Sequence, residues 1–226
     1  MKVKGDSEPT DWQEIDRFEH GVGWIAYPDE EMQRASHALV TDGGVWVVDP
    51  VDVPGLDDLL AEFGEVRGVV ILLDRHTRDS AAVANRHGVS VWVPEFMHGV
   101  SEELDAPVER FRHELADSGF AVHEVLNNAL WQEALLFDSE RGVLVVPETI
   151  GTTEYFRTGS ERLGIHPMLR LTPPRKLKRF EPKHIHVGHG PGVHEGAATA
   201  LTEAIDGSRS RAPALAVKTV SNMLPF

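Results

Sequence analysis

"VRGVVILLDRHTRDSAAVANRHGVSVWVPE", residues 66–95, is the stretch that decides the fold class. Its first part, residues 66–74, is an almost unbroken apolar run, which is typical of a strand buried on both faces. Residues 78–88 carry a helical pattern that closes at Gly88, and residues 89–94 return to a strand pattern. A strand, a helix and a second strand in this order predict an α/β protein, in which helices cover a sheet.

Further strands and helices are expected on both sides of this stretch. Upstream we predict a strand at residues 23–28, a hairpin at 36–50 turned at Asp42-Gly43-Gly44, and a helix at 53–64. Downstream the expected elements are strands at 120–126, 133–138, 142–148 and 183–192, and a helix at 193–206. Residues 96–113 resemble a loop with helical turns, 151–181 a helical excursion with a loop, and 214–226 an apolar tail that docks on the rest. No linker is visible, so we expect one domain, 1–226, with residues 1–13 as a frayed arm.

The composition excludes several classes of function. The chain has 226 residues, with 22 Lys and Arg against 36 Asp and Glu, and its net charge of −14 repels nucleic acid and anionic lipid. It has no cysteine, so disulfides and thiolate metal sites are excluded. No signal peptide or membrane span is visible, and we expect a cytoplasmic protein. The acidic, lysine-poor composition is halophile-like and suits a high-salt cytosol, although an ordinary acidic protein would have the same balance.

Four segments occur in the order that is typical of one large family. They are "HALVTDGGVWVVDP" (37–50), "LDRHTRDSAAVANRHGVSVWVPE" (73–95), "GVLVVPETIG" (142–151) and "HIHVGHGPG" (184–192). Together the chain between residues 23 and 206 resembles the metallo-β-lactamase fold superfamily. The resemblance implies a four-layer αββα sandwich. It also implies one or two divalent ions held by imidazole and carboxylate ligands at one edge of the two sheets, where they activate water.

The metal-binding motif of that family is altered in this chain. Where the family has His-x-His-x-Asp-His, the sequence has Asp74-Arg75-His76-Thr77-Arg78-Asp79. His76 is therefore kept, whereas Asp74 and Asp79 replace histidines and Arg78 replaces the aspartate. A further histidine is expected near residues 127–132, where Trp131 could fill the space instead. The bridging carboxylate corresponds to Glu148 and the final histidine to His189. Because an arginine is always protonated and cannot ligate, a standard binuclear zinc centre is not expected.

Two interpretations remain open. In the first, Asp74, His76, Asp79, Glu148 and His189 hold one divalent ion, which could be zinc, manganese or iron, and the catalytic candidates are Asp79 and Arg78. The protein would then hydrolyse ester, thioester or lactone-type bonds. In the second, Arg78 replaces the metal and pairs with Asp79 or Glu148. The protein would then be a metal-free, catalytically silent module that binds an anionic small molecule or a protein.

Three more histidines are secondary candidates. His186 lies on the last predicted strand and shares a face with His184, which we expect to be exposed. His37 lies on the first strand of the hairpin and could point into the pocket. His194 could reach the mouth of the site or begin the last helix. The expected partner is a small molecule rather than nucleic acid or a membrane, and the sequence does not indicate an oligomeric state.

Overall fold

The larger of two main sheets has seven strands. The structure, a computed structural model, describes residues 11–223. The strands follow one another across the sheet in chain order. They are β1 (Gln13–Phe18), β2 (Gly21–Ile25), β3 (Ala35–Thr41), β4 (Gly44–Val48), β5 (Val66–Val70), β6 (Val91–Pro94) and β7 (Val108–Phe111). Strands β1 to β4 pair antiparallel, whereas β4 to β7 pair parallel. Helices α1 (Leu56–Ala61) and α2 (Ser80–His87) lie in the crossovers that parallel pairing requires.

The smaller main sheet comes from the second half of the chain. Its order is β13 (His184–Val187), β10 (Val143–Val146), β9 (Trp131–Asp138) and β8 (Ala121–Asn128). A two-stranded ribbon of β11 (Ile150–Gly151) and β12 (Gly164–Ile165) follows β10. Short 3₁₀ helices span Val100–Glu103, Pro167–Leu169 and Arg175–Arg179, and the long helix α3 spans Ala197–Met223.

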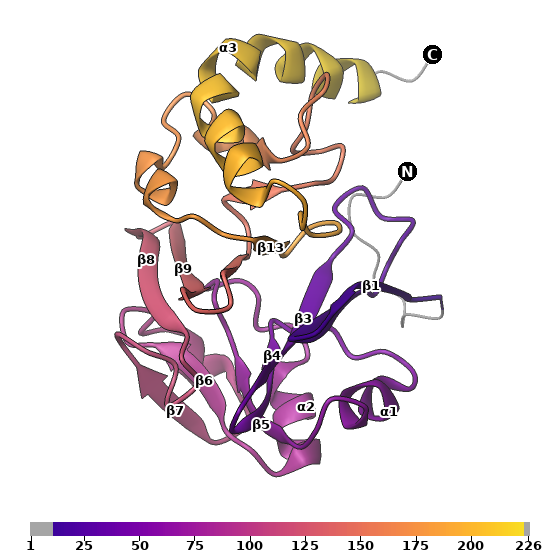
Figure 1. Cartoon of the computed structure of the whole chain (residues 1–226), viewed down its shortest axis with the longest axis vertical. Helices are drawn as coiled ribbons and strands as arrows, with labels where there is room; N and C mark the ends of the chain where they lie inside the picture. Colours follow the sequence, from indigo (N-terminus) through magenta and orange to yellow (C-terminus); the bar gives the residue numbers. More distant parts are fainter. Residues whose placement is uncertain (1–10, 224–226) are drawn as a thin grey trace.

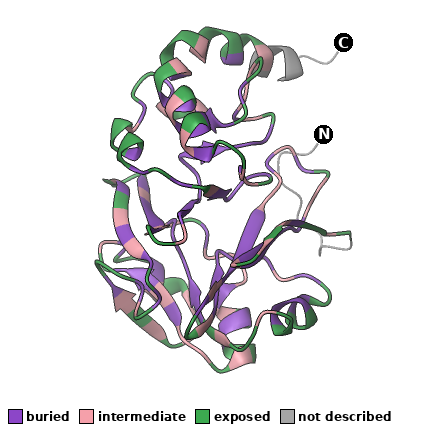
Figure 2. Cartoon of the chain, in the orientation of Figure 1, coloured by how far each residue is buried: buried purple, intermediate pink, exposed green. Residues whose placement is uncertain are grey.

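Alternating side chains of the smaller sheet define the layers. In β9 and β10, Ala134, Leu136, Val143 and Val145 belong to the apolar cluster of the larger sheet, which also contains the buried residues of α1 and α2. Their neighbours Leu135, Leu144 and Val146 belong to a second cluster with α3. The two sheets therefore pack face to face, with α1 and α2 below and α3 above (Figure 1). This is the predicted four-layer αββα sandwich. Buried residues concentrate on its strands, whereas exposed residues are frequent on the helices (Figure 2).

Several predicted boundaries are confirmed, and others are wrong. The hairpin turns where expected, since Thr41 pairs with Gly44, and α2 ends at Gly88 in the left-handed conformation with φ 67°. Residues 96–113 were predicted as a loop, yet they contain β7, which pairs along β6. Strand β1 was not predicted, and it begins at Gln13, inside the expected arm; residues 1–10 of that arm lie outside the described residues.

The last helix is longer than predicted. We expected residues 193–206, but α3 begins at Ala197 and continues to Met223, through Gly207 and Pro213. Glycine and proline normally weaken a helix interior, which explains why the sequence pattern predicts an earlier end. Among the described residues, no helix combines the length and apolarity needed to cross a bilayer.

Candidate functional site

Three buried side chains meet where strands of both sheets end. His76 lies in the turn between β5 and α2, Glu148 follows β10, and His189 follows β13. The Oε2 atom of Glu148 lies 2.9 Å from Nε2 of His189 and 3.3 Å from Nε2 of His76. We call His76, Glu148 and His189 the Glu148 cluster. One possible ligand atom from each of them lies within 4.8 Å of the other two.

Each histidine of the cluster is held by its other ring nitrogen. Nδ1 of His76 lies 3.1 Å from Oδ2 of Asp49, and Nδ1 of His189 lies 2.9 Å from the carbonyl oxygen of Met32. Because a carboxylate and a carbonyl only accept, each Nδ1 carries the proton. In the neutral tautomer, Nε2 of both rings is then a bare lone pair that faces Glu148. Burial lowers the pKa of His189, which opposes double protonation of that ring.

Glu148 is the centre of the negative charge. Burial by itself raises the pKa of Glu148, whereas His189 and His76, when their rings are protonated, donate hydrogen bonds and carry charges that lower it below its usual range. Its second oxygen, Oε1, lies 3.5 Å from Nε2 of His166 and 3.9 Å from Nη2 of Arg75. The backbone N–H of Glu148 donates to the buried carboxylate of Glu133 at 2.9 Å, which fixes this turn of the chain.

Arg78 lies beside the cluster but does not form the predicted ion pair. Its Nη1 donates to the carbonyl oxygens of Ala35 at 2.6 Å and Asp49 at 2.8 Å, and its Nη2 donates to that of Gly188 at 3.4 Å. Nη2 also lies 3.4 Å from Nε2 of His76. Within residues 11–223, no carboxylate oxygen lies within 4.0 Å of the guanidinium. The prediction that Arg78 pairs directly with Asp79 or Glu148 is therefore wrong, because backbone carbonyls take up its donors.

Asp74 and Asp79 do not join the cluster either. Oδ2 of Asp74 accepts from the backbone N–H of Gln132 at 2.9 Å, and Oδ1 faces Arg75 at 3.3 Å. Oδ2 of Asp79 accepts from the backbone N–H of Asp52 at 2.8 Å, and the residue precedes the first turn of α2. Both carboxylates therefore accept hydrogen bonds from backbone N–H groups of neighbouring segments. Of the five predicted ligands, the structure brings together His76, Glu148 and His189.

Comparison with known proteins rests on structure rather than on sequence. The sequence matches no protein-family model and shows no significant similarity to a curated protein. A metallo-β-lactamase from Pontibacter korlensis has a TM-score of 0.60 at 12% identity over 87% of this chain and 99% of its own. The mono-zinc form of the metallo-β-lactamase FIM-1 from Pseudomonas aeruginosa has a TM-score of 0.60 at 9% identity, over 92% of this chain and 99% of its own. TTHA1623 in a di-iron-bound form has a TM-score of 0.52 at 17% identity, over 74% of this chain and 93% of its own.

The chain has the metallo-β-lactamase fold. The identities are too low to say more than this, so any activity must be argued from the residues themselves. In this metallo-β-lactamase fold, the Glu148 cluster lies where strands from both sheets converge, as the sequence resemblance implies.

Three residues near the cluster were not predicted as part of the site. Asp49 ends the hairpin motif at 37–50 and has a φ of 45°, but the sequence does not reveal its bond to His76. His166 and Glu133 have no motif that could have identified them. Trp131, at the expected place of the missing histidine, is buried, and its Nε1 donates to Glu133 at 2.8 Å. The guanidinium of Arg75 lies over the Trp131 ring, 4.4 Å from its centroid.

The three secondary candidates belong to another part of this metallo-β-lactamase fold. His37, His186 and His194 gather around Asp16 rather than around Glu148. His186 was expected on an exposed face, but it is 1% exposed, because the rings of Phe18 and His37 pack against its own, with centroids 5.0 and 4.9 Å away.

A cavity of about 710 Å³ adjoins the backbone of His189. It is lined by residues of three loops, 28–33, 152–162 and 191–195, which include two arginines and four glutamates. The backbone N–H of Thr152, which lines this cavity, donates to the carbonyl oxygen of His189 at 3.1 Å. The side chains of the Glu148 cluster do not line it.

Proposed function

We propose that the protein is a hydrolase that uses one divalent metal ion held by His76, Glu148 and His189. The observation that supports this proposal is the pair of Nε2 atoms that lie 2.9 and 3.3 Å from one carboxylate oxygen. With both rings neutral, nothing in the cluster donates a proton to that oxygen, and the three atoms would repel one another. A cation among them turns this repulsion into attraction.

The separations and the charges of the cluster suit such an ion. Zinc binds imidazole and carboxylate ligands at about 2.0–2.2 Å, which places ligands of a tetrahedral site about 3.4 Å apart. The separations around Oε2 of Glu148 are 2.9 and 3.3 Å. Glu148 and Asp49 carry two buried negative charges, and Arg78 carries one positive charge, so the metal-free site with neutral rings is negative overall. Imidazole with carboxylate favours zinc, and also accepts iron or manganese.

Arg78 is the reason to propose one ion rather than two. In the sequence it replaces the aspartate that would bind a second ion, and its guanidinium lies 3.4 Å from Nε2 of His76. The three carbonyl bonds fix this positive charge in place. A second divalent ion beside it would be repelled at close range in a buried site.

The side chains around the cluster define what the site can do to a substrate. The bound ion would supply Lewis acidity, which polarises a carbonyl group and makes water acidic enough to attack it. Nδ1 of His166 accepts from the backbone N–H of Met168 at 3.3 Å, so its neutral ring turns Nε2–H toward the outer oxygen of Glu148 at 3.5 Å. Burial lowers the pKa of His166 to about 4, so the ring is neutral at neutral pH. Arg75 is 41% exposed, stacks on Trp131, and presents a positive charge beside Glu148. An ester, thioester or lactone with a nearby anionic group is the substrate class that fits these residues.

Metal content of the untagged protein, purified without chelator, tests the proposal. We expect the wild type to hold one equivalent of zinc, iron or manganese at this cluster, which elemental mass spectrometry would show as a loss of one equivalent in Glu148→Gln and in His189→Ala. His98→Ala, which changes an exposed loop histidine, should keep it. The metal-loaded protein should then hydrolyse a member of an ester, thioester and lactone panel, and lose the activity in the two cluster variants. Unchanged metal content in those variants would contradict the proposal.

One observation favours a second candidate function. Arg78 contributes a half-buried positive charge close to His76, which weakens any cation site there. If the wild-type protein takes up no metal at the Glu148 cluster even in excess Zn²⁺ and Mn²⁺, the cluster is better explained as doubly protonated histidines around Glu148. The protein would then be a binding module, and the half-exposed Arg75 is the residue at which to look for an anionic small molecule.

A further inference from the structure

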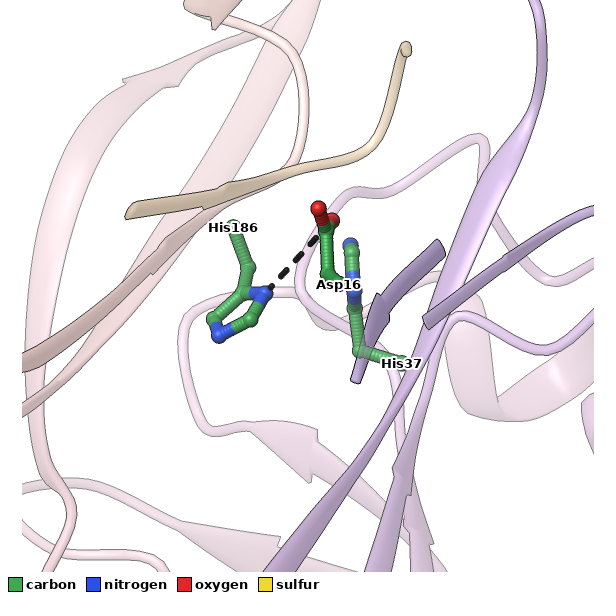
Figure 3. Close-up of side chains that lie close together, drawn as sticks. All are labelled: Asp16, His37 and His186. Carbon is green, nitrogen blue, oxygen red and sulfur yellow. Dashed lines mark ion pairs between the residues drawn. The ribbon is translucent and has the colours of Figure 1, made fainter. Parts of the chain in front are cut away.

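We propose that Asp16, His37 and His186 form a second metal site, which binds a single transition-metal ion of the zinc type. We call these three residues the Asp16 cluster. They come from β1, β3 and β13, so they join both sheets, and one possible ligand atom from each lies within 4.8 Å of the other two. Figure 3 shows the side chains turned toward one another, with Asp16 facing the His186 ring. This proposal is independent of the function proposed for the Glu148 cluster.

Both histidines of the Asp16 cluster are buried with unused ring nitrogens. Nε2 of His37 lies 2.9 Å from the carbonyl oxygen of Val187 and therefore carries the proton, which leaves Nδ1 as a lone pair. Within the described part of the chain, Nδ1 of His37 and both nitrogens of His186 have no hydrogen-bond partner. Buried polar atoms without partners destabilise a fold, so such atoms call for an explanation. A histidine whose other nitrogen donates to a backbone carbonyl is the usual arrangement at a metal.

Asp16 is directed into the cluster by an irregularity of β1. The pairing with β2 shifts between Ile15 and Phe18, and Asp16 has a φ of 56° in this bulge. Bulges redirect a side chain from the regular alternation of a strand. Oδ2 of Asp16 accepts from the backbone N–H of Gly192 at 2.7 Å and lies 3.9 Å from Nδ1 of His186, the pair joined by a dashed line in Figure 3.

Two glycines keep space beside the ligand atoms. A Cβ atom on Gly23 would lie 2.8 Å from Nδ1 of His37, the unpartnered lone pair. A Cβ atom on Gly192 would lie 3.0 Å from Oδ2 of Asp16. Any larger residue would therefore crowd the two atoms that point at the proposed ion. The close approach of backbone to these atoms is a reason for glycine at both positions.

His194 gives the cluster contact with solvent. Its Nε2 lies 3.0 Å from Oδ1 of Asp16, and its side chain is 30% exposed. An ion could enter past this ring. Two imidazoles and one carboxylate, with a third imidazole beside them, favour Zn²⁺, Ni²⁺ or Fe²⁺ over calcium or magnesium, which prefer oxygen ligands. The bound ion would link β1 and β3 of the larger sheet to β13 of the smaller one.

Zinc titration of the full chain, stripped of metal, tests this inference. The variant Glu148→Gln/His189→Ala is expected to bind one equivalent of Zn²⁺ with a rise in its thermal unfolding midpoint. Adding His186→Leu should abolish both the binding and the rise. Because the His186 nitrogens have no hydrogen-bond partner and the contact with Asp16 is long, at 3.9 Å, the metal-free His186→Leu protein should unfold at the same temperature as the wild type or higher. His98→Leu serves as the matched control at an exposed position.

Metal uptake by the variants distinguishes failure of this inference from failure of the proposed function. If only the Asp16 cluster binds, the wild type takes up one equivalent that is lost in His186→Leu and kept in Glu148→Gln. If only the Glu148 cluster binds, the pattern is reversed, and the present inference is overturned. It is also overturned if the His186→Leu chain, shown to be folded by circular dichroism, still takes up zinc in the Glu148→Gln/His189→Ala background.

Discussion

Replacing Asp49 with asparagine should weaken metal binding at the Glu148 cluster without disturbing the fold. Asparagine has the same shape and tolerates the positive φ of 45° at this position. Its side-chain oxygen can still accept from the backbone N–H of Leu72, as Oδ1 of Asp49 does at 3.0 Å. The amide nitrogen, however, would face Nδ1 of His76 and donate to it. The proton of His76 then moves to Nε2, which can no longer bind a metal ion.

The size of the effect follows from the lost bond. A hydrogen bond to a charged group contributes about 1.5–3 kcal/mol, which corresponds to roughly 10- to 100-fold in affinity. Loss of a carboxylate that orients a metal-bound histidine also weakens metal binding by about 10- to 100-fold. We therefore expect the dissociation constant for Zn²⁺ to rise by about this factor.

Competition with a chromophoric chelator measures that constant. The titration is made in a His186→Leu background, so that the Glu148 cluster is observed without the Asp16 cluster. Asp52→Asn is the matched control, because Asp52 undergoes the same chemical change in a half-exposed ion pair with Arg86. Thermal unfolding of the metal-free variants verifies that both are folded. Affinity of Asp49→Asn within threefold of its parent would refute the reasoning, since His76 would not be presenting Nε2 to an ion.

Three further outcomes are expected. Arg170→Met should lower the unfolding free energy by about 3–5 kcal/mol, because the buried carboxylate of Glu161 loses its ion-pair partner at 2.6 Å and keeps only Arg211 at 3.5 Å. Arg170→Met/Glu161→Leu should recover much of this loss in urea melts. The unfolding free energy of the metal-free chain should fall as the pH drops from 6.5 toward 4. Burial lowers the pKa of His37 and His166 to about 4, so between pH 6.5 and 4 the unfolded chain binds protons that the folded chain does not. Urea melts at stepped pH measure this dependence. An unfolding free energy that stays constant over the window would contradict the prediction. Arg75→Gln should raise KM about tenfold for an anionic substrate of the proposed hydrolase and leave that for a neutral analogue unchanged, as steady-state kinetics would show.

The order of strands and helices could be predicted where burial leaves a pattern. Strand β5 leads into the fully buried apolar run of residues 69–73, and α2 ends at a glycine, so both are visible in the sequence. Strand β1 has one buried residue, Ile15, and β7 also has one, Phe111, so neither shows a regular alternation. Both lie at edges of the larger sheet, and they are strands because of the neighbour they pair with.

The candidate site was predictable only where a motif fixes a position. His76, Glu148 and His189 follow from the order of the family motifs, and the structure brings them together. Asp74 and Asp79 are aligned equally well in sequence, but backbone N–H groups use their oxygens. Asp16 is the opposite case: 178 residues separate it from His194, and a bulge that the sequence does not show turns it inward. The partners of a buried polar group are a property of the tertiary structure.

Arg78 hydrogen-bonds to the backbone between the two clusters. Its guanidinium bonds to the carbonyl oxygens of Ala35 and Gly188, and the backbone N–H of Ala35 donates to that same oxygen of Gly188 at 2.9 Å. The start of β3 is thereby joined to the turn that follows β13. His186 and His189 lie before and after this joint, and they belong to different clusters. A half-buried cation at this point disfavours two ions around Glu148. On this reasoning, the altered motif favours two separate one-ion sites over one binuclear centre.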